Sequence, residues 1–523
     1  MPKRGGPSLT RRSVLRSGAA LGAAAGFGGV SLMNVSRGFA ASLPDPASVL
    51  AGINVGKYVK EDYRKLYNLA DDELLWDPKK DWIRTVDWEA VRSEFAGKTV
   101  KFAIGAADAE SAQDGLKPFE ELSGMSVELV PIPDDSLYDK VVAEFVSGNA
   151  SFDALQFFSP WLGDFAAQGF LAKLDEYADK WKLPIDDFYD TYKLNYGYWG
   201  GQGLYGIPFD CDIQQVHFRP KYFKEVTGGS IDAKGTIKTY DDLLKFSGEL
   251  NKVDQGVAGV GLMAGRGFWS TYTWEHVAAQ YGMDLFDDKW EPVFNNDAGI
   301  KALEMILALK KNAPTGIAGW GWSENRAAWL GGQLASNISW QDSGTQATRP
   351  DQSKIVGDVL TIYEPLVTGG RFAPPNIAGS TSVVTATSKN AEGAFLMLAF
   401  LTTASIMAMN EANANGVAPG ARSVLTNPNL RKVSQPAEVW ATELDYAWCA
   451  PRLPGMFEME QALGNEINKC IVGQSTPKEA LDAGAKAWKD IMDKNGFYSG
   501  KPPVEFAAVA DATWIGKGKT PPV

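Results

Sequence analysis

The chain has 523 residues, which is too long for one hydrophobic core and predicts two or more domains. Its formal net charge of −12 excludes binding of nucleic acid or anionic lipid through bulk electrostatics. With two His and three Cys, the sequence offers no His-based metal cluster and no zinc-type Cys spacing, so we expect no cofactor. Any enzymatic function would have to rest on carboxylates alone.

Residues 1–40 have the features of a twin-arginine signal peptide. Thr10-Arg11-Arg12-Ser13-Val14-Leu15-Arg16 precedes an Ala- and Gly-rich apolar stretch, and Gly38-Phe39-Ala40 offers small residues to a signal peptidase. Because residues 1–40 carry six basic and no acidic side chains, the net charge of a chain starting at Ala41 becomes −18. We expect a soluble periplasmic monomer after cleavage; the alternative is an N-terminal amphipathic helix or membrane anchor.

Residues 41–96 form an N-terminal extension. Short amphipathic helices are predicted at Tyr58 to Asp71 and at Trp88 to Phe95, and we assign no chemistry to them. At the other end of the chain, residues 499–523 form a Pro-rich tail. No apolar run after residue 40 is long enough to cross a membrane.

Strand-like and helix-like segments alternate from Lys98 onward. The predicted strands are 99–104, 127–130 and 152–157, and the predicted helices are 113–123, 138–147 and 163–168. This alternation is typical of a parallel sheet flanked by helices, and ligands of such sheets bind at the carboxyl ends of the strands. Those ends correspond to Ala106 to Glu110 and to Phe158 to Trp161.

The chain carries 17 Trp, and several lie beside Gly and polar residues rather than on apolar helix faces. These are Trp269, Trp274, Trp320, Trp322 and Trp340. A Trp on a helix face is usually part of the core, whereas a Trp among Gly, Asn, Asp and Ser is better explained as a platform in a cleft. Indole rings stack on the C–H faces of sugars while carboxylates and amides bind the hydroxyls.

The segment Gly203-Leu204-Tyr205-Gly206-Ile207-Pro208-Phe209-Asp210-Cys211-Asp212, followed by Pro220-Lys221-Tyr222-Phe223, carries the strongest resemblance to a known family. It resembles the crossover of the extracellular solute-binding proteins of ABC importers, in the branch that contains maltose-binding protein. Four further segments resemble parts of this family in the same order. They are 170–175, 331–340, 390–419 and 472–481.

The resemblance implies an α/β fold of two lobes, the type II periplasmic-binding-protein fold, in which each lobe is a mainly parallel sheet flanked by helices. The first lobe would comprise residues 97–209 and 372–427, and the second lobe residues 210–371 and 428–498. The chain would then cross between the lobes near Phe209, Arg371 and Asn427, and the ligand would lie in the cleft between them.

The family likeness and the strand ends together predict the ligand-binding residues. Asp210 falls at the family's sugar-binding acidic position, and Trp340 matches its stacking tryptophan. The predicted set is Asp108, Glu110, Ser159, Trp161, Asp210, Asp212, Trp269, Trp274, Trp340, Gln341, Asp342 and Ser380. Three of these have structural alternatives: Asp108 as a helix cap, Trp161 as a core residue and Asp212 as a brace of the hinge.

This acidic and aromatic inventory favours a sugar, oligosaccharide or polyol, which an importer's transmembrane subunits would receive. Three alternatives remain open. Asp210 and Asp212 could serve as the paired carboxylates of a secreted glycosidase, and aromatics with acids also suit a small cationic solute. The third is a periplasmic adaptor whose cleft binds no ligand. Cys211, Cys449 and Cys470 allow at most one disulfide, and Cys449 with Cys470 could form it or remain free thiols.

Overall fold

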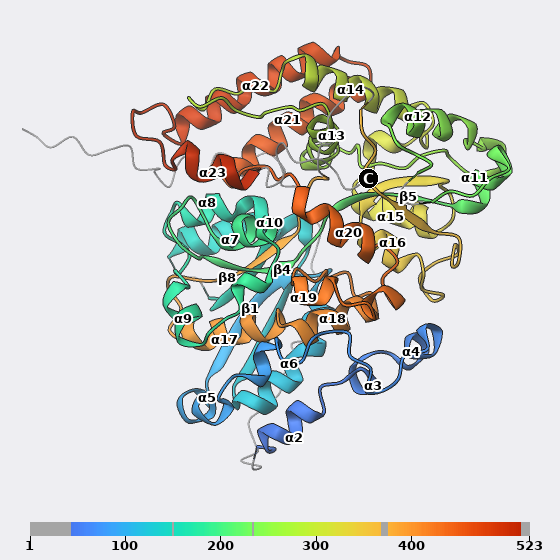
Figure 1. Ribbon diagram of the computed structural model, residues 1–523. Helices are drawn as coiled ribbons and strands as arrows, with labels where there is room; N and C mark the ends of the chain where they lie inside the picture. Colours follow the sequence, from blue (N-terminus) through green and yellow to red (C-terminus); the bar gives the residue numbers. More distant parts are fainter. Residues whose placement is uncertain (1–42, 149–150, 233–234, 368–374, 514–523) are drawn as a thin grey trace, which may run out of the picture.

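The computed structural model describes residues 43–148, 151–232, 235–367 and 375–513. Two α/β lobes lie one above the other in Figure 1, and the chain passes between them near the middle of the molecule. The predicted signal peptide, residues 1–40, lies outside the described residues. The two-lobe α/β architecture expected from the sequence is confirmed.

The first lobe is built on a five-stranded sheet with strand order β2-β1-β3-β8-β4. The strands are β1 (Thr99–Gly105), β2 (Ser126–Ile132), β3 (Ala154–Phe158), β4 (Gly206–Asp210) and β8 (Ser380–Val384). β1 pairs in parallel with β2 and β3, whereas β8 runs antiparallel to β3 and β4. The three strands predicted after Lys98 are therefore confirmed, and their carboxyl ends share one edge of the sheet.

Helices cover both faces of this sheet. They include α6 (Ala109–Ser123), α7 (Asp134–Ser147), α8 (Leu162–Ala166), α9 (Asp175–Lys180), α10 (Asp190–Tyr192), α17 (Ala391–Leu401), α18 (Ala404–Asn413) and α19 (Arg422–Leu425). Within the described part of the chain, no single helix is long and apolar enough to cross a membrane; only the pair α17 and α18, bent by 52°, passes that test by length and composition. Both helices are buried in the first lobe, because their apolar residues form its core.

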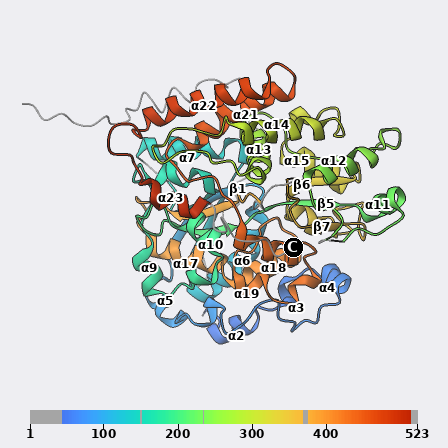
Figure 2. The ribbon, with the colours of Figure 1, turned by 45° about the horizontal axis from the view of Figure 1, so that its top comes forward.

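The second lobe contains a smaller sheet of order β6-β5-β7. Its strands are β5 (Gln214–Phe218), β6 (Ser336–Trp340) and β7 (Leu360–Ile362). All its pairings are antiparallel, which differs from the mainly parallel sheet expected for this lobe. A segment without regular strand structure runs parallel to β6, and its Gly261 forms an isolated bridge with Asn337 of that strand. Figure 2 shows this sheet beside α11 (Pro220–Thr227) and α12 (Tyr240–Glu249).

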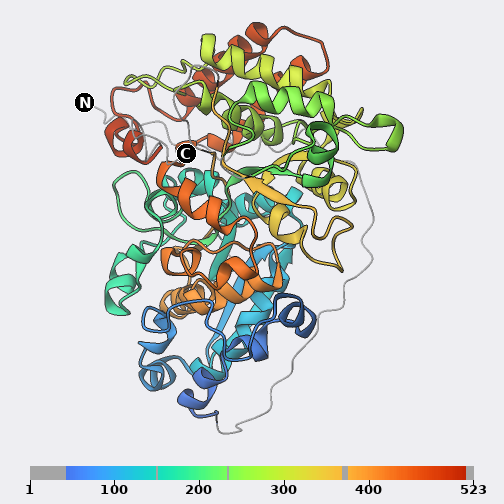
Figure 3. The same cartoon turned by 45° about the vertical axis from the view of Figure 1, so that its right-hand side comes forward.

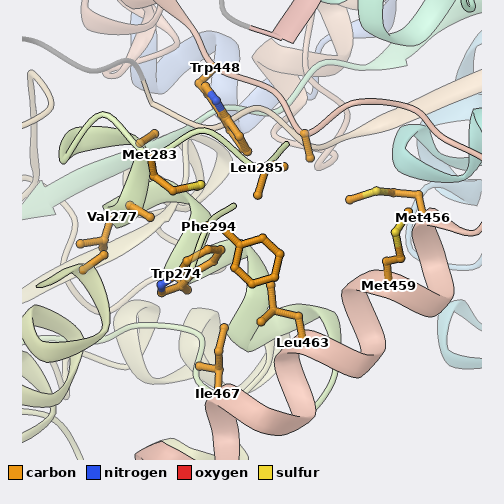
Figure 4. Close-up of a cluster of buried hydrophobic side chains, with 14 of the residues drawn as sticks. Trp274, Val277, Met283, Leu285, Phe294, Trp448, Met456, Met459, Leu463 and Ile467 are labelled. Atoms are coloured by element: carbon orange, nitrogen blue, oxygen red, sulfur yellow. The ribbon is translucent and has the colours of Figure 1, made fainter. Parts of the chain in front are cut away.

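The remaining helices of the second lobe enclose an aromatic and aliphatic core. They are α13 (Phe268–Gln280), α14 (Asp297–Lys310), α15 (Trp322–Leu330), α16 (Asp342–Gln346), α21 (Met456–Ile471) and α22 (Pro477–Lys494). Figure 4 shows Trp274 of α13 against Phe294, with Leu463 and Ile467 of α21 nearby. The long helices α21 and α22 therefore belong to the second lobe, although they follow the first-lobe helices in the sequence.

The chain crosses between the lobes in three places. The first crossing lies between β4 and β5, and the second lies between β7 and β8. The third is longer than the single point expected near Asn427, because the segment 430–449, which includes α20 (Ala437–Glu443), contacts both lobes. Leu430 packs in the first-lobe core, whereas the Glu443 carboxylate accepts hydrogen bonds from the Gln215 amide of β5 and the Glu364 backbone after β7.

The N-terminal extension is anchored on the first lobe. It contains α2 (Pro46–Ala51), α3 (Val55–Tyr58), α4 (Glu61–Tyr67) and α5 (Trp88–Phe95). The predicted helix at Trp88 to Phe95 is confirmed, but the one expected from Tyr58 to Asp71 is shorter and begins at Glu61. Trp88 packs edge-on against Phe119 and Phe400 of the first lobe.

The C-terminal tail contains a helix, α23 (Phe506–Thr513), and contacts both lobes. Phe506 packs edge-on against Trp290 of the second lobe, with ring centroids 5.2 Å apart, and the Thr513 carbonyl accepts a hydrogen bond from the Cys449 backbone. Cys211, Cys449 and Cys470 are all free and buried, so Cys449 and Cys470 do not pair.

Candidate functional site

The candidate site lies where strand ends of the first lobe meet the second lobe. The register places Ser380 opposite both Phe158 at the end of β3 and Asp210 at the end of β4. The chain then continues through Asp212 into β5, where Gln214 lies opposite Trp340. Predicted site residues from distant parts of the sequence are therefore neighbours because of strand pairing.

Four aspartates from both lobes form one electrostatic group, which we call the aspartate cluster: Asp108, Asp210, Asp212 and Asp342. Asp108 accepts a hydrogen bond from the Gln156 amide at 2.7 Å, and it does not cap α6 with its side chain. Asp210 is buried and accepts a hydrogen bond from the Ala418 backbone at 2.8 Å.

The Gln341 side chain links the hinge to the second lobe. Its amide donates to Asp212 at 2.7 Å, and its carbonyl accepts from the Ile213 backbone at 2.8 Å. Asp212 therefore does brace the hinge, as the structural alternative proposed, but it also remains partly accessible beside the other aspartates. Gln341 itself is fully buried, so its contacts in this closed arrangement are with the protein.

Burial and mutual repulsion raise the pKa values of the aspartate cluster. Burial is the main cause for each residue. It raises the pKa of Asp108 to about 7, with Asp134 and Asp342 adding to the effect, and that of Asp342 to about 6, against the opposing effect of Arg326. The pKa values of Asp210 and Asp212 lie well above their usual range, where burial acts together with the repulsion between acidic neighbours. The cluster thus favours a bound proton, a hydroxyl donor or a cation.

A narrow crevice opens next to this cluster. It is lined by Gln341, Asp342, Thr345 and Gln346 from the second lobe and by Glu411, Ala414, Gly416, Val417 and Ala418 from the first. The Thr345 hydroxyl donates to Glu411 across the lobes at 2.8 Å. The crevice has no room for even a water-sized sphere, so the lobes must separate to admit a solute.

Aromatic rings form a second part of the site on the second-lobe side. Trp340 and Tyr272 pack edge-on with centroids 6.2 Å apart, and Phe268 lies against Trp269 at 4.4 Å. Across the lobes, the Phe268 ring lies 6.2 Å from that of Phe158. Trp340 is 3% exposed, so it reaches a solute only when the lobes part or when a ligand displaces its neighbours.

Two buried glutamates lie behind these rings, and we call Glu275 and Glu460 the glutamate pair. Tyr272 donates to Glu460 at 3.2 Å, the Asn376 amide lies 3.5 Å from Glu275, and one carboxylate oxygen of each glutamate lacks a hydrogen-bond partner. Burial raises the pKa of Glu275 to about 8 and that of Glu460 well above its usual range, while Arg452 opposes both shifts.

Arg452 connects the glutamate pair to the first lobe. Its guanidinium donates to the Ser159 hydroxyl at 2.8 Å, to the Ala450 carbonyl at 2.6 Å and to the Asn195 carbonyl at 3.3 Å. Ser159 is thus near the interface as predicted, but its hydroxyl is already engaged by Arg452. No local sequence pattern marks Arg452, Glu460 and Tyr272 as site residues, because only the packing of α21 against α13 brings them together.

Two predicted ligand residues lie away from this interface in the structure. Trp274 is fully buried in the second-lobe core and donates to the Gly299 carbonyl at 3.0 Å (Figure 4). Glu110 is exposed and forms a 3.7 Å ion pair with Lys60 of the extension. Trp161 lies at the interface but is buried there, with its ring 5.0 Å from that of Tyr138 in the first lobe and 5.4 Å from that of Phe457 in α21 of the second lobe.

Among the residues that the structure describes, no three His, Cys, Asp or Glu side chains are placed to hold one metal ion. The aspartates contact amide and backbone donors instead, which is the environment of carboxylates that recognise hydrogen-bond donors.

The sequence model of the bacterial extracellular solute-binding protein family matches residues 99–408. A probable amino-acid ABC transporter periplasmic-binding protein of Sinorhizobium fredii is 24% identical over 414 residues, covering 77% of this chain and 91% of that protein. A mannitol-binding protein of Pseudomonas aeruginosa is 24% identical over 322 residues, covering 56% of this chain and 70% of that protein.

Solved structures show the same architecture. An ABC transporter solute-binding protein of Agrobacterium radiobacter in complex with ribitol is 21% identical with a TM-score of 0.68, and one of Agrobacterium vitis with bound D-mannitol is 21% identical with a TM-score of 0.66. Each comparison covers 76% of this chain and 99% of the other chain. The chain belongs to the family of bacterial extracellular solute-binding proteins and has the family's two-lobe fold.

Proposed function

We propose that the protein captures a polyol or a small sugar between its two lobes in the periplasm and delivers it to the transmembrane subunits of an ABC importer. The observation that carries this proposal is the arrangement of carboxylates and indole rings on the facing surfaces of the lobes. Asp210 and Asp212 supply acceptors for hydroxyl groups, and Trp340 supplies an apolar face for a carbon skeleton.

The relatives support this ligand class without deciding it. Two of the compared proteins carry ribitol and D-mannitol, and a third is named as a mannitol-binding protein. A linear polyol offers vicinal hydroxyls that a carboxylate binds through paired hydrogen bonds.

A glycosidase interpretation has less support, because the matching family and the compared solved structures are described as binding proteins. We propose a binding function without catalysis. We also propose a twin-arginine signal at residues 1–40 and a monomeric mature protein.

A small cationic solute is the second candidate, and the aspartate cluster is the observation that favours it. Four carboxylates with raised pKa values would gain from a ligand that brings positive charge. A relative at 24% identity is named as a probable amino-acid ABC transporter periplasmic-binding protein, and amino acids carry an ammonium group.

A matched ligand pair distinguishes the two candidates. The chain from Ala41 onward should be titrated by calorimetry and thermal shift with ribitol, D-mannitol and D-sorbitol, and with the amine analogue of D-sorbitol, 1-amino-1-deoxy-D-sorbitol. A neutral-polyol receptor is stabilised by about 2.7 kcal/mol at a hundred-fold excess of ligand over Kd and prefers the neutral member. Preference for the amine would favour the cationic candidate, and binding of neither would reject both proposed ligand classes.

A further inference from the structure

The N-terminal extension touches both lobes, although it lies before the part of the chain that the family model matches. Its residues 55–67, comprising α3 and α4, run along the side of the interface. Figure 1 shows α3 and α4 beside the lower lobe and below the yellow segment of the upper lobe, and Figure 3 shows the blue extension from another side. We call residues 55–67 the clasp.

The clasp is fixed to the first lobe through Asn413 at the end of α18. The Asn413 amide donates to the Tyr58 carbonyl at 2.8 Å, and its side-chain carbonyl accepts from the Lys60 backbone at 2.9 Å. Asn413 is 2% exposed, so these two bonds are shielded from water and hold the peptide between α3 and α4 in place.

Two tyrosines of α4 reach the second lobe. The Tyr63 hydroxyl donates to the Asp351 carboxylate at 2.8 Å and accepts from the Gln352 amide at 3.2 Å. The Tyr67 hydroxyl lies 2.7 Å from that of Thr348. The residues 348–352 that receive both tyrosines directly follow α16, which lines the crevice.

Arg349 joins the clasp to the wall of the crevice. The Tyr63 and Tyr67 rings lie 4.7 Å and 4.5 Å from its guanidinium, which is fully buried. One guanidinium nitrogen donates to the carbonyls of Glu411, Ala412 and Val433 on the first-lobe side, at 3.1, 2.9 and 3.3 Å. The other two nitrogens have no hydrogen-bond partner, so the tyrosine rings supply the contact that replaces water.

We propose that the clasp holds the two lobes together beside the crevice. Through Arg349, it also positions Glu411, which lines the crevice on the side that a bound solute would meet. The proposal rests on the lobes parting to admit a solute, but not on which solute binds. Opening the lobes at this edge must separate Tyr63 from Asp351 and Tyr67 from Thr348, and it exposes Arg349. The extension therefore adds a cost to opening and slows the release of a captured solute.

The test measures the distance between the lobes without any added solute. Spin labels are placed on Lys140→Cys in α7 and Glu249→Cys in α12, both exposed, while the three native thiols are buried. The distance distribution is recorded for dialysed full-length mature protein with the native clasp and with Tyr63→Phe and Tyr67→Phe combined. The phenylalanines keep both rings over Arg349 and remove only the hydroxyl contacts with the second lobe.

We expect the double variant to raise the ratio of open to closed lobes roughly ten-fold, seen as a population at a changed inter-label distance. Tyr58→Phe is the matched control, because Tyr58 belongs to the same extension and contacts the first lobe through its backbone; its distribution should equal that of the parent. Thr348→Val should reproduce part of the effect from the opposite side, and adding Tyr67→Phe to it should then change little.

With D-mannitol as the probe, stopped-flow tryptophan fluorescence should show solute release several-fold faster in the double variant. Identical distance distributions in parent and double variant, with both proteins folded by circular dichroism, would overturn the clasp. Failure of D-mannitol to bind would count against the polyol proposal alone, because the distance measurement needs no ligand. A lower melting temperature with an unchanged distribution would reduce the tyrosines to structural contacts and would also overturn the clasp.

Discussion

The aspartate cluster and the glutamate pair are both acidic groups at the interface of the lobes, but their surroundings differ. Glu275 and Glu460 are fully buried next to Arg452, whose guanidinium is held by Ser159 and two backbone carbonyls. Asp108 and Asp212 stay partly accessible, and their partners are neutral amides. Carboxyl groups that are buried beside an arginine serve the fold, whereas carboxyl groups left beside an opening are available to a ligand.

Arg452→Met should have the largest effect, on stability rather than on ligand recognition. It leaves the buried Ser159 hydroxyl and the Ala450 carbonyl without this donor, so we expect a loss of about 3 kcal/mol, the order expected when buried polar groups lose their hydrogen-bond partner. Urea unfolding of the ligand-free protein measures it. Arg422→Met is the control, because Arg422 forms a half-exposed pair with Asp445 and should cost under about 1 kcal/mol.

Trp340→Ala should weaken solute binding by about 2 kcal/mol, the order for an aromatic anchor at an interface. Trp340 ends β6 next to the aspartate cluster and packs with Tyr272 at the interface of the lobes. Calorimetry with the best solute of the screen gives the loss. Trp181→Ala, on the outer side of the first lobe, should bind normally. If Trp340→Ala unfolds far more easily yet binds as the parent does, Trp340 belongs to the core.

Asp210→Asn keeps the size of the side chain and removes its charge. For a neutral polyol we expect an affinity loss of roughly 1 to 3 kcal/mol, the range for hydrogen bonds to a charged group. For a cationic solute the loss should be larger and should shrink as salt rises, because screening weakens the attraction in the parent protein. Unchanged affinity at every salt concentration would remove Asp210 from the site.

The ligand-free protein should lose stability as the pH rises from about 4 to 8. Folding raises the pKa of Asp108 to about 7 and that of Glu275 to about 8, so the folded state holds protons that the unfolded state has released. Their stabilising contribution is complete below the unfolded pKa values and disappears as the pH passes the folded ones. Asp108→Asn should reduce the fall in the free energy of unfolding between pH 4 and pH 8 by on the order of 1 kcal/mol, as measured by urea unfolding at each pH.

Glu275→Gln serves as the comparison in the same pH series. The contribution of Glu275 to the loss of stability should extend to a higher pH, near pH 8, because its pKa is higher than that of Asp108. A profile that stays flat between pH 5 and 8 in the parent protein would contradict the raised pKa values of both groups.

Much of the first lobe could be predicted from the sequence. The runs that became β1, β2 and β3 alternate with amphipathic segments, and this local pattern survives folding because each element buries its own apolar side against the sheet. The crossover motif also placed Asp210 and Asp212 correctly at the junction of the lobes. The second-lobe sheet was less predictable, since its antiparallel pairings join segments far apart in the chain.

The sequence by itself determined the family, the two-lobe plan and the position of the aspartates, because these depend on motifs and on strand ends that are local in the chain. Tertiary structure alone decided which tryptophans face the interface: Trp274 and Trp340 have similar neighbours in sequence, yet only Trp340 lies there. It also decided the partners of Glu460 and Arg452 and the contact of the extension with the second lobe. Burial and charge compensation depend on elements that meet only when the chain folds, so no local pattern records them.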